Sequence, residues 1–210
     1  MKALLICDDY WHPGDIVEKG FEFLPEYGFE LTVVKRPHEI WAQKLSDYDL
    51  VILSKSENTR SEENNVLWMT EDAENEIVDY VENGGGFLVT HSGTVPYKTA
   101  PKFTALLGCA FTHHPEACPV TMTPLKKYPL NEGVETFTET DEHYHVVVSA
   151  EDADIFMATV SAHGAQTGGY VRRQGSGRVC VLTPGHRAEV WANANYRQML
   201  KNAVDYCTGK

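Results

Sequence analysis

The chain has 210 residues, 42% of them hydrophobic and 23% charged, a balance that predicts an ordered α/β protein with one well-buried core. Its formal net charge of −12 argues against nucleic acids and anionic membranes as partners, because like charges repel. The first apolar run is too short for a signal peptide or a membrane span and the five cysteines lack C-x-x-C spacing, so we expect a cytoplasmic protein.

The first half of the chain alternates short apolar strands with amphipathic helices. Strands are expected at residues 3–7, 31–34, 50–53 and 87–90. A first helix is expected from Ile16 to near Gly28, and a second over residues 71–83 with Thr70 as its N-cap. The strands are apolar on both faces, as in buried parallel sheets. This order predicts a doubly wound, mostly parallel sheet with helices on both faces.

The second half, from Pro115 onward, contains short β-rich pieces with turn residues between them. These pieces are expected at residues 120–123, 134–138, 146–149, 155–159 and 170–173. They are interpreted as an antiparallel extension of the sheet, followed by a last strand at 179–183 and a closing helix at 195–207. The polar stretch 54–65 is expected to be a solvated loop. We therefore predict a single domain covering residues 1–210.

Polar side chains follow several of the predicted strand ends. His12, His91 and His186 each come shortly after an apolar strand. Because the carboxyl ends of parallel strands meet at one edge of a sheet, these three imidazoles are expected to converge. Three imidazole nitrogens and a water form a known catalytic metal site, so the pattern predicts a divalent metal such as zinc, manganese or iron. No Gly-x-Gly-x-x-Gly or P-loop is present, so no nucleotide cofactor is expected.

The acidic run at residues 139–145 supplies a candidate carboxylate. Glu142 is interpreted as a fourth metal ligand or as a general base. A catalytic carboxylate needs a pKa raised toward neutrality, and Glu139 and Asp141 are the neighbours expected to raise it. The alternative is a solvated strand with alternating polar residues.

Other polar residues have equally simple structural explanations. A single histidine after a strand is more often a hydrogen-bonded loop residue than a metal ligand. His113 and His114 are interpreted as surface residues rather than ligands. Trp11, beside His12, is either a platform for a sugar ring or a lid over the core.

The turn at residues 89–93 occupies the place of a nucleophile elbow. The motifs Gly-x-Ser-x-Gly and Gly-x-Cys-x-Gly are absent, and the middle position holds His91, a poor nucleophile for acyl transfer.

Several segments, in the same order along the chain, resemble ThuA-like proteins, the trehalose-utilisation family. His91-Ser92-Gly93 after a glycine-rich strand resembles that family's Leu-His-Ser segment, and Thr183-Pro184-Gly185-His186 resembles its Pro-Gly-His turn. Glu142-His143-Tyr144 is similar to a Glu-x-Tyr element, and Trp11-His12-Pro13 to a histidine-bearing loop after the first strand.

The resemblance implies a flavodoxin-like fold related to class I glutamine amidotransferases, and a role in carbohydrate metabolism. Those amidotransferases carry a cysteine where this chain has His91, and a His-x-Glu pair where His186 and Glu189 are one residue too far apart. Glutamine hydrolysis is therefore not expected. The expected reaction is isomerisation, elimination or hydrolysis of a sugar or keto-sugar.

The residues expected to carry this function fall into two groups. The catalytic residues are predicted to be His91, Glu142 and His186. The substrate-binding residues are predicted to be Asp8, Trp11, His12, Ser92, Gly93, Tyr144 and His145. The expected partners are a small sugar and further copies of the same chain.

Two other functions are compatible with the same residues. A non-catalytic sugar-binding module would use Trp11, Tyr97, Tyr144 and Trp191 as stacking surfaces. Alternatively, the histidines bind metal adventitiously and the acidic surface serves an oligomer partner.

Overall fold

The computed structural model describes residues 1–57, 67–95, 97 and 99–210. The strands are β1 (Lys2–Cys7), β2 (Glu30–Val34), β3 (Leu50–Ser54), β4 (Gly86–Thr90), β5 (Cys109–His113), β6 (Cys118–Pro124), β7 (Phe137–Asp141), β8 (His145–Val148), β9 (Asp154–Ser161), β10 (Gly164–Gln174) and β11 (Gly177–Leu182). The α-helices are α1 (Gly14–Gly20), α2 (Pro37–Trp41), α3 (Glu71–Glu82), α4 (Pro101–Leu107), α5 (Ala188–Ala192) and α6 (Ala194–Thr208).

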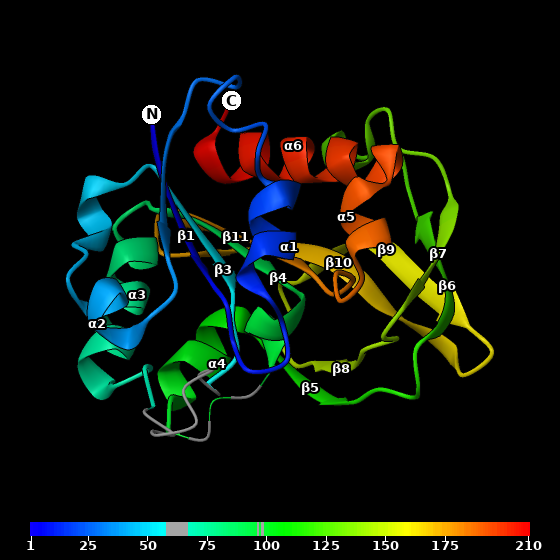
Figure 1. Cartoon of the computed structure of the whole chain (residues 1–210), viewed down its shortest axis with the longest axis horizontal. Helices are drawn as coiled ribbons and strands as arrows, with labels where there is room; N and C mark the ends of the chain where they lie inside the picture. Colours follow the sequence, from blue (N-terminus) through cyan, green and yellow to red (C-terminus); the bar gives the residue numbers. More distant parts are fainter. Residues whose placement is uncertain (58–66, 96, 98) are drawn as a thin grey trace.

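One mixed sheet organises the described residues. Its nine strands have the order β2-β1-β3-β4-β11-β10-β9-β6-β7, and β5 and β8 form a separate antiparallel pair. The neighbours from β2 to β11 are parallel, and those from β11 to β7 are antiparallel. The antiparallel part is the predicted extension, continuous with the parallel part (Figure 1).

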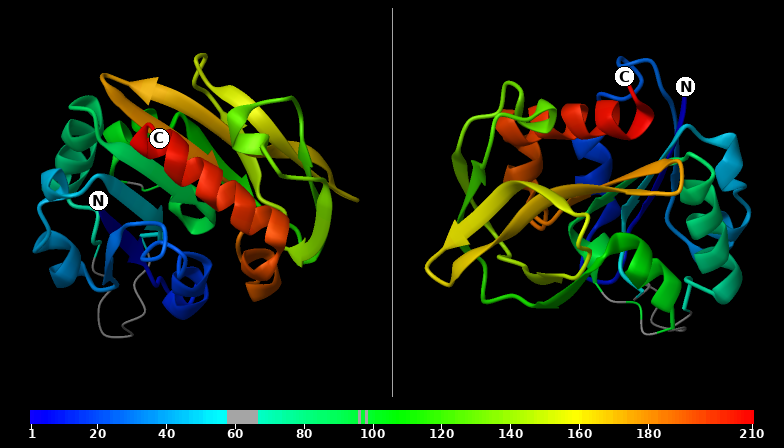
Figure 2. Two further views of the ribbon diagram at one scale, coloured as in Figure 1. Left: turned by 90° about the horizontal axis from the view of Figure 1, so that it is seen from above. Right: turned by 180° about the vertical axis from the view of Figure 1, so that it is seen from behind.

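Both faces of the parallel part are buried. Alternate residues of β1 enter two different cores: Leu5 packs with residues of α1 and α6, whereas Leu4 packs with residues of α3 and α4. The two helix layers can be followed in Figure 2, where the view from behind brings α3 and α4 forward and leaves α6 on the far side. This double burial explains why the predicted strands are continuous apolar runs. Among the helices of the described residues, none is long and apolar enough to cross a lipid bilayer.

The helix over residues 71–83 is confirmed as α3, with the Thr70 hydroxyl accepting a hydrogen bond from the Ala73 backbone N–H. The first helix is shorter than predicted and ends at Gly20 instead of near Gly28. A Cβ atom at Gly20 would lie 2.1 Å from the Trp191 ring, so only a glycine lets α1 pack against Trp191 of α5. Glycine also has a low helix propensity, which is consistent with the end of α1 at this residue.

Other differences from the predictions come from short elements and from burial. Helices α2, α4 and α5 and strand β5 span only five to seven residues each, too few to show a clear hydrophobic period. The predicted piece at 134–138 begins only at Phe137. The loop predicted at 54–65 is not solvated at its start, because Ser54, Lys55 and Ser56 are buried. From residue 58 that prediction lies outside the described residues.

Candidate functional site

A cluster of three histidines and one carboxylate lies at the carboxyl edge of the parallel strands. His12, His91 and His186 follow β1, β4 and β11, and Glu142 follows β7 of the antiparallel part. Each of the four side chains offers one ligand atom, and these atoms all lie within 4.8 Å of one another. The structure therefore brings together the three imidazoles expected to converge and the acid expected to serve them.

His12 is oriented by the neighbouring Asp9. The fully buried Asp9 carboxylate contacts His12 Nδ1 at 2.7 Å and accepts hydrogen bonds from the backbone N–H groups of Trp11, His12 and Ser56. Burial raises the pKa of Asp9, but these hydrogen bonds outweigh it and lower the pKa to about 2. Burial lowers the pKa of His12. A neutral His12 donates through Nδ1 to Asp9 and turns the lone pair of Nε2 toward the cluster.

His91 occupies the middle of the elbow-like turn with a backbone φ of +42°, in the left-handed region that side chains other than glycine seldom adopt. Its Nδ1 donates to the carbonyl oxygen of Thr183 at 2.9 Å, which leaves Nε2 as an acceptor. That Nε2 atom is buried, faces the cluster and has no hydrogen-bond partner.

His186 is placed by a second buried carboxylate. Asp141 is fully buried and accepts hydrogen bonds from the backbone N–H groups of Gly185, His186 and Arg187 at 2.8, 2.9 and 3.1 Å. This fixes the turn after β11 so that His186 Nδ1 lies 3.2 Å from Glu142 Oε2. The contact is not aligned for a hydrogen bond, and Nδ1 is a second buried nitrogen without a partner.

Glu142 Oε2 is the common neighbour of the imidazoles. It lies 3.5 Å from His91 Nε2, 3.2 Å from His186 Nδ1 and 3.6 Å from Nε2 of the half-exposed His114. Burial raises the pKa of Glu142, but the neighbouring His186 and His91 lower it by a larger amount. The pKa of Glu142 therefore lies well below its usual range. The expectation that acidic neighbours raise this pKa is wrong, because Asp141 is turned toward backbone N–H groups. Contact with Glu142 raises the pKa of His186.

Tyr144 forms one wall of the cluster. Its ring stacks on His91 with centroids 4.0 Å apart, and its hydroxyl lies 3.4 Å from His12 Nε2. Burial raises the pKa of the hydroxyl well above its usual value, so Tyr144 is a neutral hydrogen-bond donor at this site.

The other predicted binding residues are less closely associated with the cluster. The Asp8 carboxylate accepts a hydrogen bond from the Gly14 backbone N–H, and Asp9, not Asp8, contacts His12. Trp11 is 63% exposed, and its ring contacts that of Tyr10. His145 belongs to a different group, stacked on His113 and hydrogen-bonded to Gln166.

Sequence reasoning missed Asp9, Lys55 and the positioning role of Asp141. Lys55 is fully buried, and its ammonium donates to the backbone carbonyl of Asp8, where the chain has a φ of +72°. It also approaches the Cys7 carbonyl at 3.5 Å. The sequence did contain a signal for this, namely the two adjacent acids Asp8 and Asp9 directly after β1. A charged side chain at the end of a buried strand is almost never fully buried unless it has a partner, so a buried partner for these acids could have been sought. His114, interpreted as a surface residue, does lie half exposed but beside Glu142.

Gly93 allows the elbow to pack against β3. A Cβ atom there would lie 2.7 Å from the Leu53 carbonyl oxygen and 2.7 Å from Val89 Cγ1. Gly93→Ala is therefore expected to lower the free energy of unfolding by about 2 kcal/mol, measured by urea denaturation. The matched variant Ser92→Ala removes a buried hydroxyl that has no partner and should stay within about 0.5 kcal/mol of wild type. Equal stability of the two variants would contradict the close packing at Gly93.

Comparison with known structures gives the same fold at low sequence identity. A ThuA-like protein from Bacteroides uniformis superposes with a TM-score of 0.78 at 19% identity, covering 100% of this chain and 92% of that chain. A ThuA-like protein from Parabacteroides merdae gives 0.78 at 18% identity, with 100% and 91% coverage. A β-galactosidase from Rahnella sp. R3 gives 0.65 at 14% identity, over 97% of this chain and 30% of that chain.

Sequence comparison places the chain in a family. A search of the curated proteins found no match. The family model described as ThuA, trehalose utilisation, matches residues 13–207. The matched residues include His91, Glu142 and His186 of the cluster, and His12 lies just before them. The chain belongs to the ThuA, or trehalose utilisation, family.

Proposed function

We propose that this protein is a cytoplasmic enzyme of carbohydrate metabolism that acts on a sugar or keto-sugar at a divalent metal ion held by His12, His91 and His186. The fold is interpreted as a flavodoxin-like scaffold related to glutamine amidotransferases, without their cysteine nucleophile. The family description supports the link to sugars. The observation that carries the metal site is the pair of buried imidazole nitrogens that face Glu142 without a hydrogen-bond partner.

The outer contacts of the imidazoles favour a cation. Asp9 and the Thr183 carbonyl accept hydrogen bonds from the Nδ1 atoms of His12 and His91, a tautomer in which the Nε2 lone pair of each ring faces the cluster. Glu142 adds negative charge at the same point. Lone pairs and a carboxylate gathered in a buried site repel one another unless a proton or a metal ion lies between them. Zinc, manganese and iron all accept this set of nitrogen and oxygen ligands.

The remaining chemistry comes from the side chains around the histidines. A divalent ion held by His12, His91 and His186 would supply Lewis-acid polarisation of a carbonyl or hydroxyl oxygen of the substrate. Glu142 is ionised at neutral pH, since its pKa is lowered, and is therefore suited to accept a proton from a carbon or a water beside that oxygen. Tyr144 donates a hydrogen bond from its neutral hydroxyl. These roles fit isomerisation, elimination or hydrolysis.

Metal analysis of untagged protein tests the site. Wild-type protein purified without chelator is expected to hold about one equivalent of zinc, manganese or iron per chain. His91→Ala should weaken metal binding by roughly 10–100-fold or more, because it removes a ligand. His38→Ala, an exposed histidine of α2, is the control and should retain the metal. Stoichiometric metal in His91→Ala would contradict the site.

A second candidate function is sugar binding without catalysis. It is favoured by Tyr10 and Trp11, which lie in the loop leading to His12 and are 51% and 63% exposed. The centroids of their two rings are 4.6 Å apart. Such rings stack well on sugar faces. The two functions are separated by incubating the metal-loaded protein with 3-keto-disaccharides and following the products: turnover supports the enzyme, and saturable binding without turnover supports the binding module.

A further inference from the structure

A cavity of about 390 Å³ lies between β1 and the helices α2 and α3, and it shares no residue with the histidine cluster. Its described lining is mainly apolar, and Ile6, Ile40, Leu45, Trp68 and Ile77 are all buried there. Cavities of about 300–1,000 Å³ with apolar walls and a few polar groups are typical of small-molecule sites. We refer to it as the tryptophan pocket, after Trp41 and Trp68.

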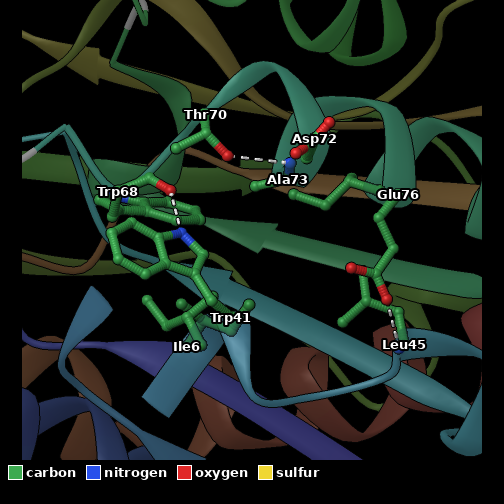
Figure 3. A pocket seen from close by; sticks show the side chains of 10 residues that line it. Ile6, Trp41, Leu45, Trp68, Thr70, Asp72, Ala73 and Glu76 are labelled. Carbon is green, nitrogen blue, oxygen red and sulfur yellow. Dashed lines mark hydrogen bonds between the residues drawn. The ribbon is translucent and has the colours of Figure 1, made fainter. Parts of the chain in front are cut away.

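The two indole rings of the tryptophan pocket have no free hydrogen-bond donor. Trp41 Nε1 donates to the Trp68 carbonyl oxygen at 2.8 Å (Figure 3), and Trp68 Nε1 donates to the Ser56 carbonyl oxygen at 2.9 Å. The Trp41 side chain is nevertheless 46% exposed, unusual for a large apolar ring. What these residues offer a ligand is therefore aromatic and aliphatic surface.

The polar groups of the tryptophan pocket are acidic. Asp72 and Glu76 lie one turn apart on α3 and are exposed, and of the described residues that line the cavity none is basic. Glu76 Oε1 accepts a hydrogen bond from the Leu45 backbone N–H, which holds this carboxylate at the cavity (Figure 3). Two carboxylates outweigh the half unit of positive charge at a helix N-terminus. The charge of the lining therefore favours a cation and opposes an anion.

We propose that the tryptophan pocket binds a small organic amine, with its ammonium group beside Asp72 and Glu76 and its apolar or aromatic body against Trp41, Trp68 and Ile77. An ammonium group near the exposed Trp41 ring gains a cation–π contact as well as the carboxylate charge. The cavity volume suits a molecule of this size rather than a protein partner, which needs a much larger surface. The site goes beyond the sugar chemistry proposed above and uses none of its residues.

Tryptamine is the probe, titrated by calorimetry into the wild-type protein as purified, with indole-3-propionate as its anionic analogue. Tryptamine is expected to bind saturably with one site per chain, and the anion at least tenfold more weakly. The double variant Asp72→Asn/Glu76→Gln should weaken tryptamine binding about fivefold, as expected for exposed charges. Asp79→Asn, an exposed acid of α3 outside the cavity lining, is the matched control and should bind like wild type.

Three outcomes would overturn the proposal: no saturable binding of tryptamine, equal affinity for the two analogues, or the same loss in Asp79→Asn as in the double variant. Trp41→Ala tests the aromatic contact and is expected to weaken tryptamine binding about tenfold, with folding checked by circular dichroism. Unchanged affinity in a folded Trp41→Ala would also overturn it. These measurements involve neither metal content nor sugar turnover, so they stand or fail separately from the proposed function.

Discussion

Glu142→Gln is expected to lower turnover of a keto-sugar by about 10²–10⁴-fold, the usual contribution of a positioned general base. The amide has the same shape as the carboxylate but cannot accept the substrate proton. In the metal-free protein its NH₂ group can donate to the unpartnered nitrogens of His91 and His186, which lie 3.5 and 3.2 Å from the carboxylate oxygen, and in the metal-bound protein the ion takes these lone pairs instead. The variant should therefore fold normally and keep its metal on the three histidines. Turnover, urea denaturation and metal content together check this result.

The matched control for Glu142 is Glu116→Gln, an exposed acid in the connection after β5. It should leave turnover, stability and metal content unchanged. A near wild-type rate for Glu142→Gln with metal bound would remove Glu142 from the mechanism. Loss of metal together with turnover would assign Glu142 as a ligand rather than as a base.

Asp141→Ala is expected to cause the largest loss of stability, about 3 kcal/mol or more, because each buried donor left unpaired costs about 1–3 kcal/mol. The donors are the backbone N–H group of Gly185, whose hydrogen bond is buried, and those of His186 and Arg187, whose hydrogen bonds are partly buried. Without the carboxylate the turn after β11 is no longer held, so His186 should leave its position and metal affinity should also fall. Urea denaturation followed by circular dichroism measures the first effect, and metal titration of the folded fraction measures the second.

Asp152→Ala provides the comparison for Asp141. This carboxylate pairs with Arg172 but its side chain is 51% exposed, so its removal should change the free energy of unfolding by less than about 1 kcal/mol. If Asp141→Ala unfolded at the same urea concentration as Asp152→Ala, the buried hydrogen bonds to the turn would not have the assigned importance.

The sequence predicts the parallel part of the fold well because the patterns that specify its strands and helices lie within short stretches of the chain. Strands such as β1 and β4 are buried on both faces, so each is a continuous apolar run. Helix α3 has a capping residue, a hydrophobic period and a glycine-rich end, and its bounds differ from the prediction by one residue. Helices α2 and α4 each have a proline at the start but only five and seven residues, too short for their period to be recognised.

The three imidazoles of the candidate site are predictable because their positions depend on strand direction. His12, His91 and His186 follow strands of one parallel set, so their approach follows from topology. The choice of Asp9 instead of Asp8 depends on the folded loop after β1, in which Asp8 has a φ of +72° and Asp9 contacts His12. That conformation, held by the buried Lys55, has no counterpart in the local sequence pattern.

The sequence by itself determines the alternation of strands and helices, the edge at which three histidines gather and the membership of the ThuA family. Only the tertiary structure decides that Glu142 joins them, that Asp141 holds the turn of His186, and that Trp41 and Trp68 line a cavity with two acids. The physical reason is separation along the chain. Strand periodicity and capping act over a few residues, whereas these contacts join segments that meet only when the antiparallel strands and the helices pack on the parallel sheet.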